Sequence, residues 1–255
     1  MRKVETAILP RIMTRLYFPD DIPAHGECTL PEAQVHHVVH VLRLAAGDAV
    51  TLFDGRGTEY PATILRTSKR AVVVRIANAR TVDRESPLHV TLVQAVSSGE
   101  RMDYTIQKAV ELGVSHVQPV ISQRSVVRLK SERAEKRVAH WQYIVIAACE
   151  QCGRNTVPEV ASVLPFANWL ATLPADGAGS RLLLSPHADQ PLAAMIKPAQ
   201  GVTLLAGPEG GFDDAEIEMA LTRGFIALSL GPRVLRTETA ALAALVALQT
   251  KWGDF

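Results

Sequence analysis

From Leu16 to Ile76 the chain alternates short apolar runs with turn residues, a pattern typical of β-strands. The run Ala49–Phe53 leads directly into Asp54-Gly55, a strong turn dipeptide. Further strands are expected near Leu16 and at Tyr60–Leu65 and Ala71–Ile76. Only Pro31–Leu44 has apolar positions at helical spacing. Several strands and one helix in about 65 residues predict a small β-barrel.

The pattern of apolar and polar positions changes after a polar segment at residues 78–87, where we place a domain boundary. Strands and helices then alternate, which predicts an α/β domain with a mostly parallel sheet. The predicted domains are 13–80 and 87–255, and residues 1–12 are interpreted as a non-structural extension. The expected strands are Leu88–Ala95, Val114–Ile121, Leu182–Ser185, Val202–Ala206 and Ile226–Leu230, and the clearest helices are Asp103–Leu112, Ser131–Gln151 and Thr237–Lys251.

Composition narrows the class of protein. A chain of 255 residues with 47% hydrophobic residues can build real cores, which excludes a disordered tail protein. The longest apolar run, Ala240–Leu248, is too short to cross a bilayer. Three cysteines do not make a secreted disulfide framework, and no signal-peptide pattern precedes the first strand, so a cytoplasmic protein with no membrane partner is expected.

The net charge of +1 hides an asymmetry along the chain. Residues 1–80 carry eleven Lys and Arg against eight Asp and Glu, whereas residues 161–255 carry six against nine. A polyanionic partner should therefore touch the N-terminal and central parts. Ordinary solvated surface charge explains a difference of this size equally well.

The segment Val202–Phe212 carries the strongest chemical signal. An apolar strand runs into a loop with three glycines, and an acidic helix start follows at Asp213. Ligands of open α/β sheets bind beyond the carboxyl ends of strands, where glycines let the backbone approach them. The loop lacks the Lys-Ser/Thr of a P-loop and does not fit Gly-x-Gly-x-x-Gly, which disfavours nucleoside triphosphates and dinucleotides. A tight turn without a ligand remains the alternative.

A second loop of this kind follows the strand Ile226–Leu230. It opens the final helix, with Thr237 or Thr239 as the expected capping hydroxyl. Two such loops in one domain could build a single pocket from backbone groups, which would suit an adenine edge better than a phosphate.

Gly-Pro-Glu-Gly-Gly at 207–211 and Leu-Gly-Pro-Arg-Val-Leu-Arg-Thr-Glu-Thr-Ala at 230–240 resemble the two cofactor-loop signatures of the SPOUT methyltransferases. Within them, the chain is most similar to the family that methylates N3 of a uridine in 16S ribosomal RNA. Further matches are His37–Arg43, Gly99–Gly113, Arg124-Ser125 and Ala148–Arg154. The resemblance implies a PUA-like N-terminal barrel, a C-terminal α/β domain with a deep trefoil knot, and a homodimer.

The resemblance also implies the ligands and the residues that hold them. The cofactor is S-adenosylmethionine, no metal is expected, and the partner is 16S rRNA, in the assembled 30S subunit. Cofactor-binding residues carried over from the loops are Leu205, Ala206, Gly207, Glu209, Gly210, Gly211, Leu230, Gly231, Val234, Leu235 and Thr239. The expected RNA contacts are Arg15, His37, Arg43, Arg101, Arg124 and Arg128.

Methylation of uracil N3 needs a proton acceptor and a cation, because N3 is protonated at neutral pH and the attacking base becomes anionic. Glu150 and Arg154 are four residues apart and are expected on one face of a helix or its end. Arg154 is the first candidate for stabilising the uracil anion, with Glu150 orienting it or accepting the proton. Arg236 is the second candidate cation, and a structural Glu–Arg pair is the alternative.

Several features have a plainer interpretation. Cys149 and Cys152 have redox or half-zinc spacing, but two helix-face thiols are favoured. His36 and His40 are four apart without the glutamate of a zinc-protease motif, so a solvated or RNA-facing surface is favoured over a metal site. Ser98 stands where the family usually has a lysine, so one RNA-contacting charge is missing. The basic segment 124–137 is either a phosphate-contacting surface or a solvated helix start.

Two other classes of function stay open on the residues alone. One is a non-catalytic RNA-binding or ribosome-assembly protein on the same fold, which the intact glycine loops argue against. The other is an α/β oxidoreductase, against which the missing dinucleotide fingerprint weighs.

Overall fold

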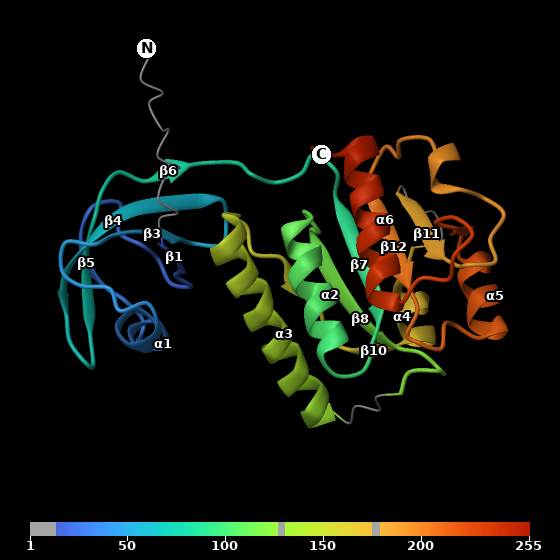
Figure 1. Cartoon of the computed structure of the whole chain (residues 1–255), viewed down its shortest axis with the longest axis horizontal. Coiled ribbons are helices and arrows are strands. Elements are labelled where there is room, and N and C mark those ends of the chain that lie inside the picture. Colours follow the sequence, from blue (N-terminus) through green and yellow to red (C-terminus); the bar gives the residue numbers. More distant parts are fainter. Residues whose placement is uncertain (1–13, 127–130, 175–178) are drawn as a thin grey trace, which may run out of the picture. The chain divides into compact units, whose positions relative to one another are not determined.

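The computed structural model describes residues 14–126, 131–174 and 179–255, which form two compact units (Figure 1). The first unit extends to Arg84 and includes Gly153–Thr156, and the second comprises Glu85–Cys152 and Val157–Phe255. The extension expected at residues 1–12 lies outside the described residues. Among the described helices, none combines the length and apolar character needed to span a membrane.

The first unit is built on a six-stranded, mostly antiparallel sheet. Its main path runs β1-β3-β4-β5-β2, with β6 paired to β4, and only β1 and β3 are parallel. The strands are β1 (Thr14–Tyr17), β2 (Gly26–Thr29), β3 (Ala49–Phe53), β4 (Thr58–Thr67), β5 (Val72–Ile76) and β6 (Arg80–Thr81). β3 has the predicted bounds, whereas β2 and the short β6 carry too few apolar residues to be recognised in the sequence.

One helical segment packs on this sheet. It consists of α1 (Glu32–His36) continued by a π-helical turn, η1 (His37–Val41), and ends before Arg43, whose φ is +54°. Val35 and Val38 from this segment join a buried cluster with strand residues such as Leu16, Leu52 and Val74. The predicted small β domain with one helix is therefore confirmed, although the helix is shorter than the predicted Pro31–Leu44.

The second unit contains a seven-stranded sheet in which every recorded strand pairing is parallel. The order is β10-β8-β7-β12-β11-β13, with β9 beside β8. The strands are β7 (Val90–Ala95), β8 (His116–Ile121), β9 (Glu159–Val160), β10 (Leu164–Pro165), β11 (Ser180–Leu184), β12 (Val202–Ala206) and β13 (Phe225–Leu228). The predicted parallel α/β domain is thus confirmed, while the trefoil knot stays a prediction from the resemblance.

Helices cover this sheet on both faces (Figure 1). On one face, α4 and α5 close a core in which Phe166 and Trp169 meet Val93, Leu183 and Leu205. The other layer is formed by α2, α3 and α6, with α2 packed against both of the others. The helices are α2 (Glu100–Glu111), α3 (Ser131–Cys152), α4 (Phe166–Thr172), α5 (Asp214–Thr222) and α6 (Thr237–Trp252), with a 3₁₀ turn, η2, at Leu192–Ala194.

A buried glutamine joins α6 to the end of α2. Gln249 Nε2 donates to the carbonyl of Leu112 at 2.9 Å, and its Oε1 accepts from Ser86 Oγ at 2.6 Å. Gly113 makes room for this amide, because a Cβ there would lie 2.7 Å from Gln249 Nε2. Its φ of +80° also belongs to the left-handed region that favours glycine.

Gly113→Ala is expected to destabilise the second unit more than Gly224→Ala. Both glycines have positive φ, +80° and +77°, but a Cβ at Gly224 meets nothing within 4 Å. The left-handed conformation costs an alanine about 1–2 kcal/mol, and crowding at Gly113 adds about 1–3 kcal/mol. The measurement is urea unfolding followed by tryptophan fluorescence, since Trp141, Trp169 and Trp252 all lie in this unit. Equal losses in the two variants would contradict the role given to the Gln249 contact.

Candidate functional site

A cavity of about 470 Å³ opens where β11, β12 and β13 end. Its walls are three segments that follow these strands: 183–187, 206–212 and 228–240. The volume falls in the range of small-molecule sites, about 300–1,000 Å³. Arg101 from the first turn of α2, Arg124 from the loop after β8 and Ile217 from α5 also line the cavity.

Parallel pairing brings these three segments together. β11 lies between β12 and β13, with Leu183 opposite Leu205 and Leu184 opposite Leu228. The carboxyl ends of all three strands therefore meet at one edge of the sheet, which is where open α/β folds bind ligands.

Hydrogen bonds to one carbonyl oxygen tie two of the walls to each other. The carbonyl of Gly207, in the loop after β12, accepts from Thr237 Oγ1 at the start of α6 and from Gln94 Nε2 on β7. Gln94 Nε2 also donates to Thr237 Oγ1 at 3.1 Å. The prediction that Thr237 or Thr239 caps α6 is wrong, because the N-cap position is Arg236 and no side-chain cap bond is present. The Thr237 hydroxyl reaches Gly207 instead.

Glu209 fixes the same loop to the segment before α2. Its Oε1 accepts from Ser98 N at 2.9 Å, Ser98 Oγ at 2.7 Å and Arg101 Nη1 at 2.8 Å. Partial burial alone would raise the pKa of Glu209, but the bonds from Ser98 and Arg101 outweigh it and lower the pKa to about 2. Glu209 is thus an ionised structural clamp. Ser98 contributes two of its three donors.

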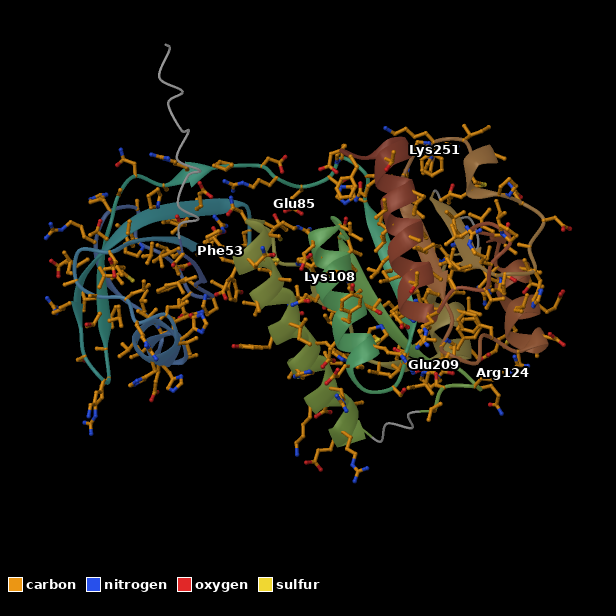
Figure 2. The ribbon with its side chains drawn as sticks, in the orientation of Figure 1. Phe53, Glu85, Lys108, Arg124, Glu209 and Lys251 are labelled. Atoms are coloured by element: carbon orange, nitrogen blue, oxygen red, sulfur yellow. The ribbon has the colours of Figure 1, made fainter. Side chains whose placement is uncertain are left out.

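Arg124 supports the glycines of this loop from the other side. Its Nη1 donates to the carbonyls of Gly210 at 3.1 Å and Phe212 at 3.3 Å. Figure 2 shows Arg124 and Glu209 on neighbouring loops of the second unit. A Cβ at Gly210 would lie 3.3 Å from the Arg124 Cβ, so the small residue is needed for this close approach.

Most residues expected to hold the cofactor line this cavity. Leu205 and Thr239 do not: Leu205 is fully buried in the sheet core, and Thr239 is exposed on α6. Sequence reasoning missed the wall at 183–187, which has no glycine signature, although the strand before it was predicted. Residues that line the cavity as expected are Ala206, Gly207, Glu209, Gly210, Gly211, Leu230, Gly231, Val234 and Leu235.

Glu150 lies on α3 and Arg154 follows the end of that helix, so the expected Glu150–Arg154 pair stays a prediction. Helix α3 ends at Cys152, and Gly153 with φ of +92° turns the chain, so Arg154 lies beyond the helix face. Arg154 is buried and belongs to the first unit, whereas Glu150 lies on α3 in the second. Among the described residues, neither lines the cavity, but Arg236 does, from the segment before α6.

Arg15 is held inside the first unit, and its expected RNA contact stays a prediction. Its side chain is 10% exposed and forms an ion pair with Glu59 at 3.0 Å, while Arg84 pairs with the same carboxylate at 2.9 Å. Arg15 also bonds the side chain of Asn155 and the carbonyl of Arg154. Burial alone would raise the pKa of Glu59, but the bonds from Arg84 and Arg15 outweigh it and lower the pKa. Arg15 therefore anchors the turn at 153–156.

The other expected RNA contacts are differently placed. Arg43 is exposed and His37 is half-buried in the first unit, Arg101 and Arg124 line the cavity, and Arg128 lies outside the described residues. The ring centroids of His36 and His40 lie 5.0 Å apart with the rings tilted by 42°, as neighbours at helical spacing can. In the part of the chain that the structure describes, no group of three or more His, Cys, Asp or Glu could hold a metal. Cys149 and Cys152 lie on α3 and are not joined by a disulfide.

Glu209→Gln is expected to cost about 1–3 kcal/mol of unfolding free energy at pH 7, because charge-assisted bonds are lost. The pKa of Glu209 is lowered from 4.5 to about 2 on folding, so its stabilisation is fully present above pH 4.5 and is lost as the pH falls toward 2. Urea unfolding at pH 7, 5, 4 and 3 measures the difference from the unaltered chain. The exposed Glu218, changed to Gln, is the control. A difference that stays constant down to pH 3 would refute the clamp.

Comparison with known proteins agrees with this geometry. The family model for an RNA methyltransferase domain matches residues 84–249, and one for an RNA methyltransferase PUA domain matches residues 30–77. Ribosomal RNA small subunit methyltransferase E from Buchnera aphidicola (subsp. Acyrthosiphon pisum) is 31% identical over 98% of both chains. The Bacillus subtilis protein of the same name is 31% identical over 84% of this chain and 86% of its own.

Two solved structures are similar over nearly the whole chain. Ribosomal RNA small subunit methyltransferase E from Neisseria gonorrhoeae, bound to S-adenosylmethionine, is 44% identical with a TM-score of 0.89. A Legionella pneumophila protein, also solved with S-adenosylmethionine, is 41% identical with a TM-score of 0.91. Each alignment covers 95% of this chain and 99% of the other. By family model, sequence and structure, the chain belongs to the ribosomal RNA small subunit methyltransferase E family.

Proposed function

We propose that this chain transfers a methyl group from S-adenosylmethionine to N3 of a uridine in 16S ribosomal RNA. The observation that carries the proposal is the three-walled cavity at the ends of β11, β12 and β13, in a chain 44% identical to a relative solved with that cofactor. The assembled small subunit is the proposed form of the substrate, the homodimer the proposed form of the protein, and the cytoplasm its proposed location.

The cavity suits S-adenosylmethionine in its size and its chemistry. Backbone groups of the loops after β12 and β13 can meet an adenine edge. Two carboxylates, Glu209 and Glu238, line a site that must accept a positively charged sulfonium ligand. When bound, the cofactor supplies a methyl group activated for in-line displacement.

The residues of the chain must align the acceptor base and manage its charge. Uracil N3 becomes anionic as its proton leaves, and a cation lowers the energy of that charge. Arg236 lines the cavity and is the cation we place there, while Arg154, on the turn held by Arg15 and Asn155, is the second candidate. Glu150 stays a candidate for orienting Arg154.

Three arginines and one histidine provide the proposed RNA contacts. Arg101 and Arg124 lie at the cavity, and Arg43 and His37 lie on the first unit, whose match is to a PUA domain of RNA methyltransferases. Contacts of this kind bind phosphates and set register without reading bases. Arg15 stays a predicted contact outside this set, because its guanidinium is paired with Glu59.

Transfer of labelled methyl from S-adenosylmethionine to small subunits that lack the modification tests the function. Digestion of the captured RNA is expected to place the label in 3-methyluridine. Label in another nucleoside would contradict the proposed base atom. Cofactor binding without label would point to another RNA substrate, and neither binding nor label would favour a non-catalytic RNA-binding protein.

The same assay tests the proposed cation. Arg236→Ala is expected to lower the single-turnover rate by about 10²–10³-fold, as when one transition-state donor is removed. The matched control is Lys197→Ala, an exposed cation of the same unit outside the cavity lining. A rate for Arg236→Ala equal to that of the control would assign the role to another residue.

A further inference from the structure

Glu238 is a cavity-lining carboxylate with an unsatisfied oxygen. It lies in the first turn of α6, two residues after Arg236, and it lines the cavity at the strand ends. Its Oε2 is buried from solvent and has no hydrogen-bond partner among the described residues. Sequence analysis gave this residue no role, although it lies inside the second loop signature.

A buried hydrogen-bond acceptor without a partner lowers the stability of the fold, so its position in the cavity needs an explanation. Leaving a buried polar group unsatisfied costs about 1–3 kcal/mol, and more when the group is charged. Such groups in native proteins call for an explanation in terms of function or of an absent partner. The dipole of α6 offsets part of the cost, since negative charge is stabilised in the first turn of a helix. The remaining cost is what a proton donor brought into the cavity would relieve.

The other carboxylate of the cavity cannot serve as well. Glu209 Oε1 already accepts three hydrogen bonds, from Ser98 N, Ser98 Oγ and Arg101, and its pKa of about 2 makes it a weak proton acceptor. Glu150, the acceptor considered from sequence, is on α3 and lies outside the cavity lining that the structure describes. Glu238 is the cavity carboxylate that combines an ionisable group with an unoccupied acceptor.

We infer that Glu238 is the general base of the methyl transfer and takes the N3 proton of the target uridine. The inference rests on the proposed function and assigns a residue to its proton step. A lone pair on N3 forms the new bond to the methyl carbon while the carbon–sulfur bond breaks and its electrons pass to sulfur. The electrons of the N3–H bond stay on N3, and the proton moves to the carboxylate of Glu238. The products are 3-methyluridine, S-adenosylhomocysteine and the protonated carboxyl group.

The charges around Glu238 suit this step. Arg236 precedes it on the same segment and can hold the developing negative charge of the base, so the cation and the proton acceptor lie two residues apart. Glu238 and Arg236 share the cavity with five other charged or titratable side chains, and any pH dependence of the step is set by all seven together. The five are Arg101, Arg124, His187, Glu209 and Arg233.

The test is the single-turnover rate of Glu238→Gln on small subunits across a range of pH. Glutamine keeps the shape but cannot take the proton, so the rate near pH 7 is expected to fall by about 10²–10⁴-fold. The deficit should narrow as the pH rises, because N3 then loses its proton to solvent and needs no protein base. Calorimetric affinity for S-adenosylhomocysteine should stay within about a factor of three.

Two further variants separate the base from a structural role. Glu238→Asp keeps a carboxylate and should retain more of the rate than Glu238→Gln at pH 7. Glu218→Gln, on exposed α5 surface, should match the unaltered chain.

Three results would overturn the assignment. One is an unchanged rate in Glu238→Gln. The second is a deficit that does not vary with pH and is matched by loss of S-adenosylhomocysteine binding, which would make Glu238 a cofactor ligand. The third is absence of methyl transfer by the unaltered chain, which would overturn the proposed function first and this assignment with it.

Discussion

The site depends on the parallel placement of β11 between β12 and β13. Each strand taken alone is a short apolar run that ends in a loop. Pairing Leu183 with Leu205 and Leu184 with Leu228 ends all three strands at one edge, so the loops become walls of one cavity. The Gly207 carbonyl then ties two walls together through Thr237 and Gln94.

The two glutamates of the cavity, Glu209 and Glu238, differ in the hydrogen-bond donors around their carboxylates. Glu209 is surrounded by donors from Ser98 and Arg101, which keep it ionised and use it to hold a loop. Glu238 has an oxygen without a donor and sits beside Arg236, which leaves it able to accept a proton. The same residue type therefore serves structure in one place and, on our proposal, chemistry in the other, and only the hydrogen-bond environment tells them apart.

Local patterns in the sequence predicted the elements well and their partners less well. Short apolar runs predicted β3 and β12 with the observed bounds, because the residues of a buried strand must be mostly apolar. Short edge elements such as β6 and β9 have two residues each and leave no periodic signal. The glycine loops marked two cavity walls, whereas the wall at 183–187 became visible only once strand order was known.

The roles of polar side chains were the hardest to predict from sequence. A threonine at a helix start is expected to cap it, yet Thr237 bonds a carbonyl in a loop thirty residues away. Spacing suggested that Glu150 and Arg154 share a helix face, but a glycine ends the helix between them. Arg15 was expected to contact RNA, and in the structure it is buried against Glu59, which is 44 residues away in the sequence. Long-range partners decide the roles of Thr237 and Arg15, and local sequence does not record them.

The most direct test of this account is a crystal structure of the chain with S-adenosylhomocysteine. The account predicts the ligand between segments 183–187, 206–212 and 228–235, with its adenine against backbone groups of the loops after β12 and β13. A ligand bound elsewhere, with this cavity empty, would contradict the central claim that three adjacent strand ends create the site.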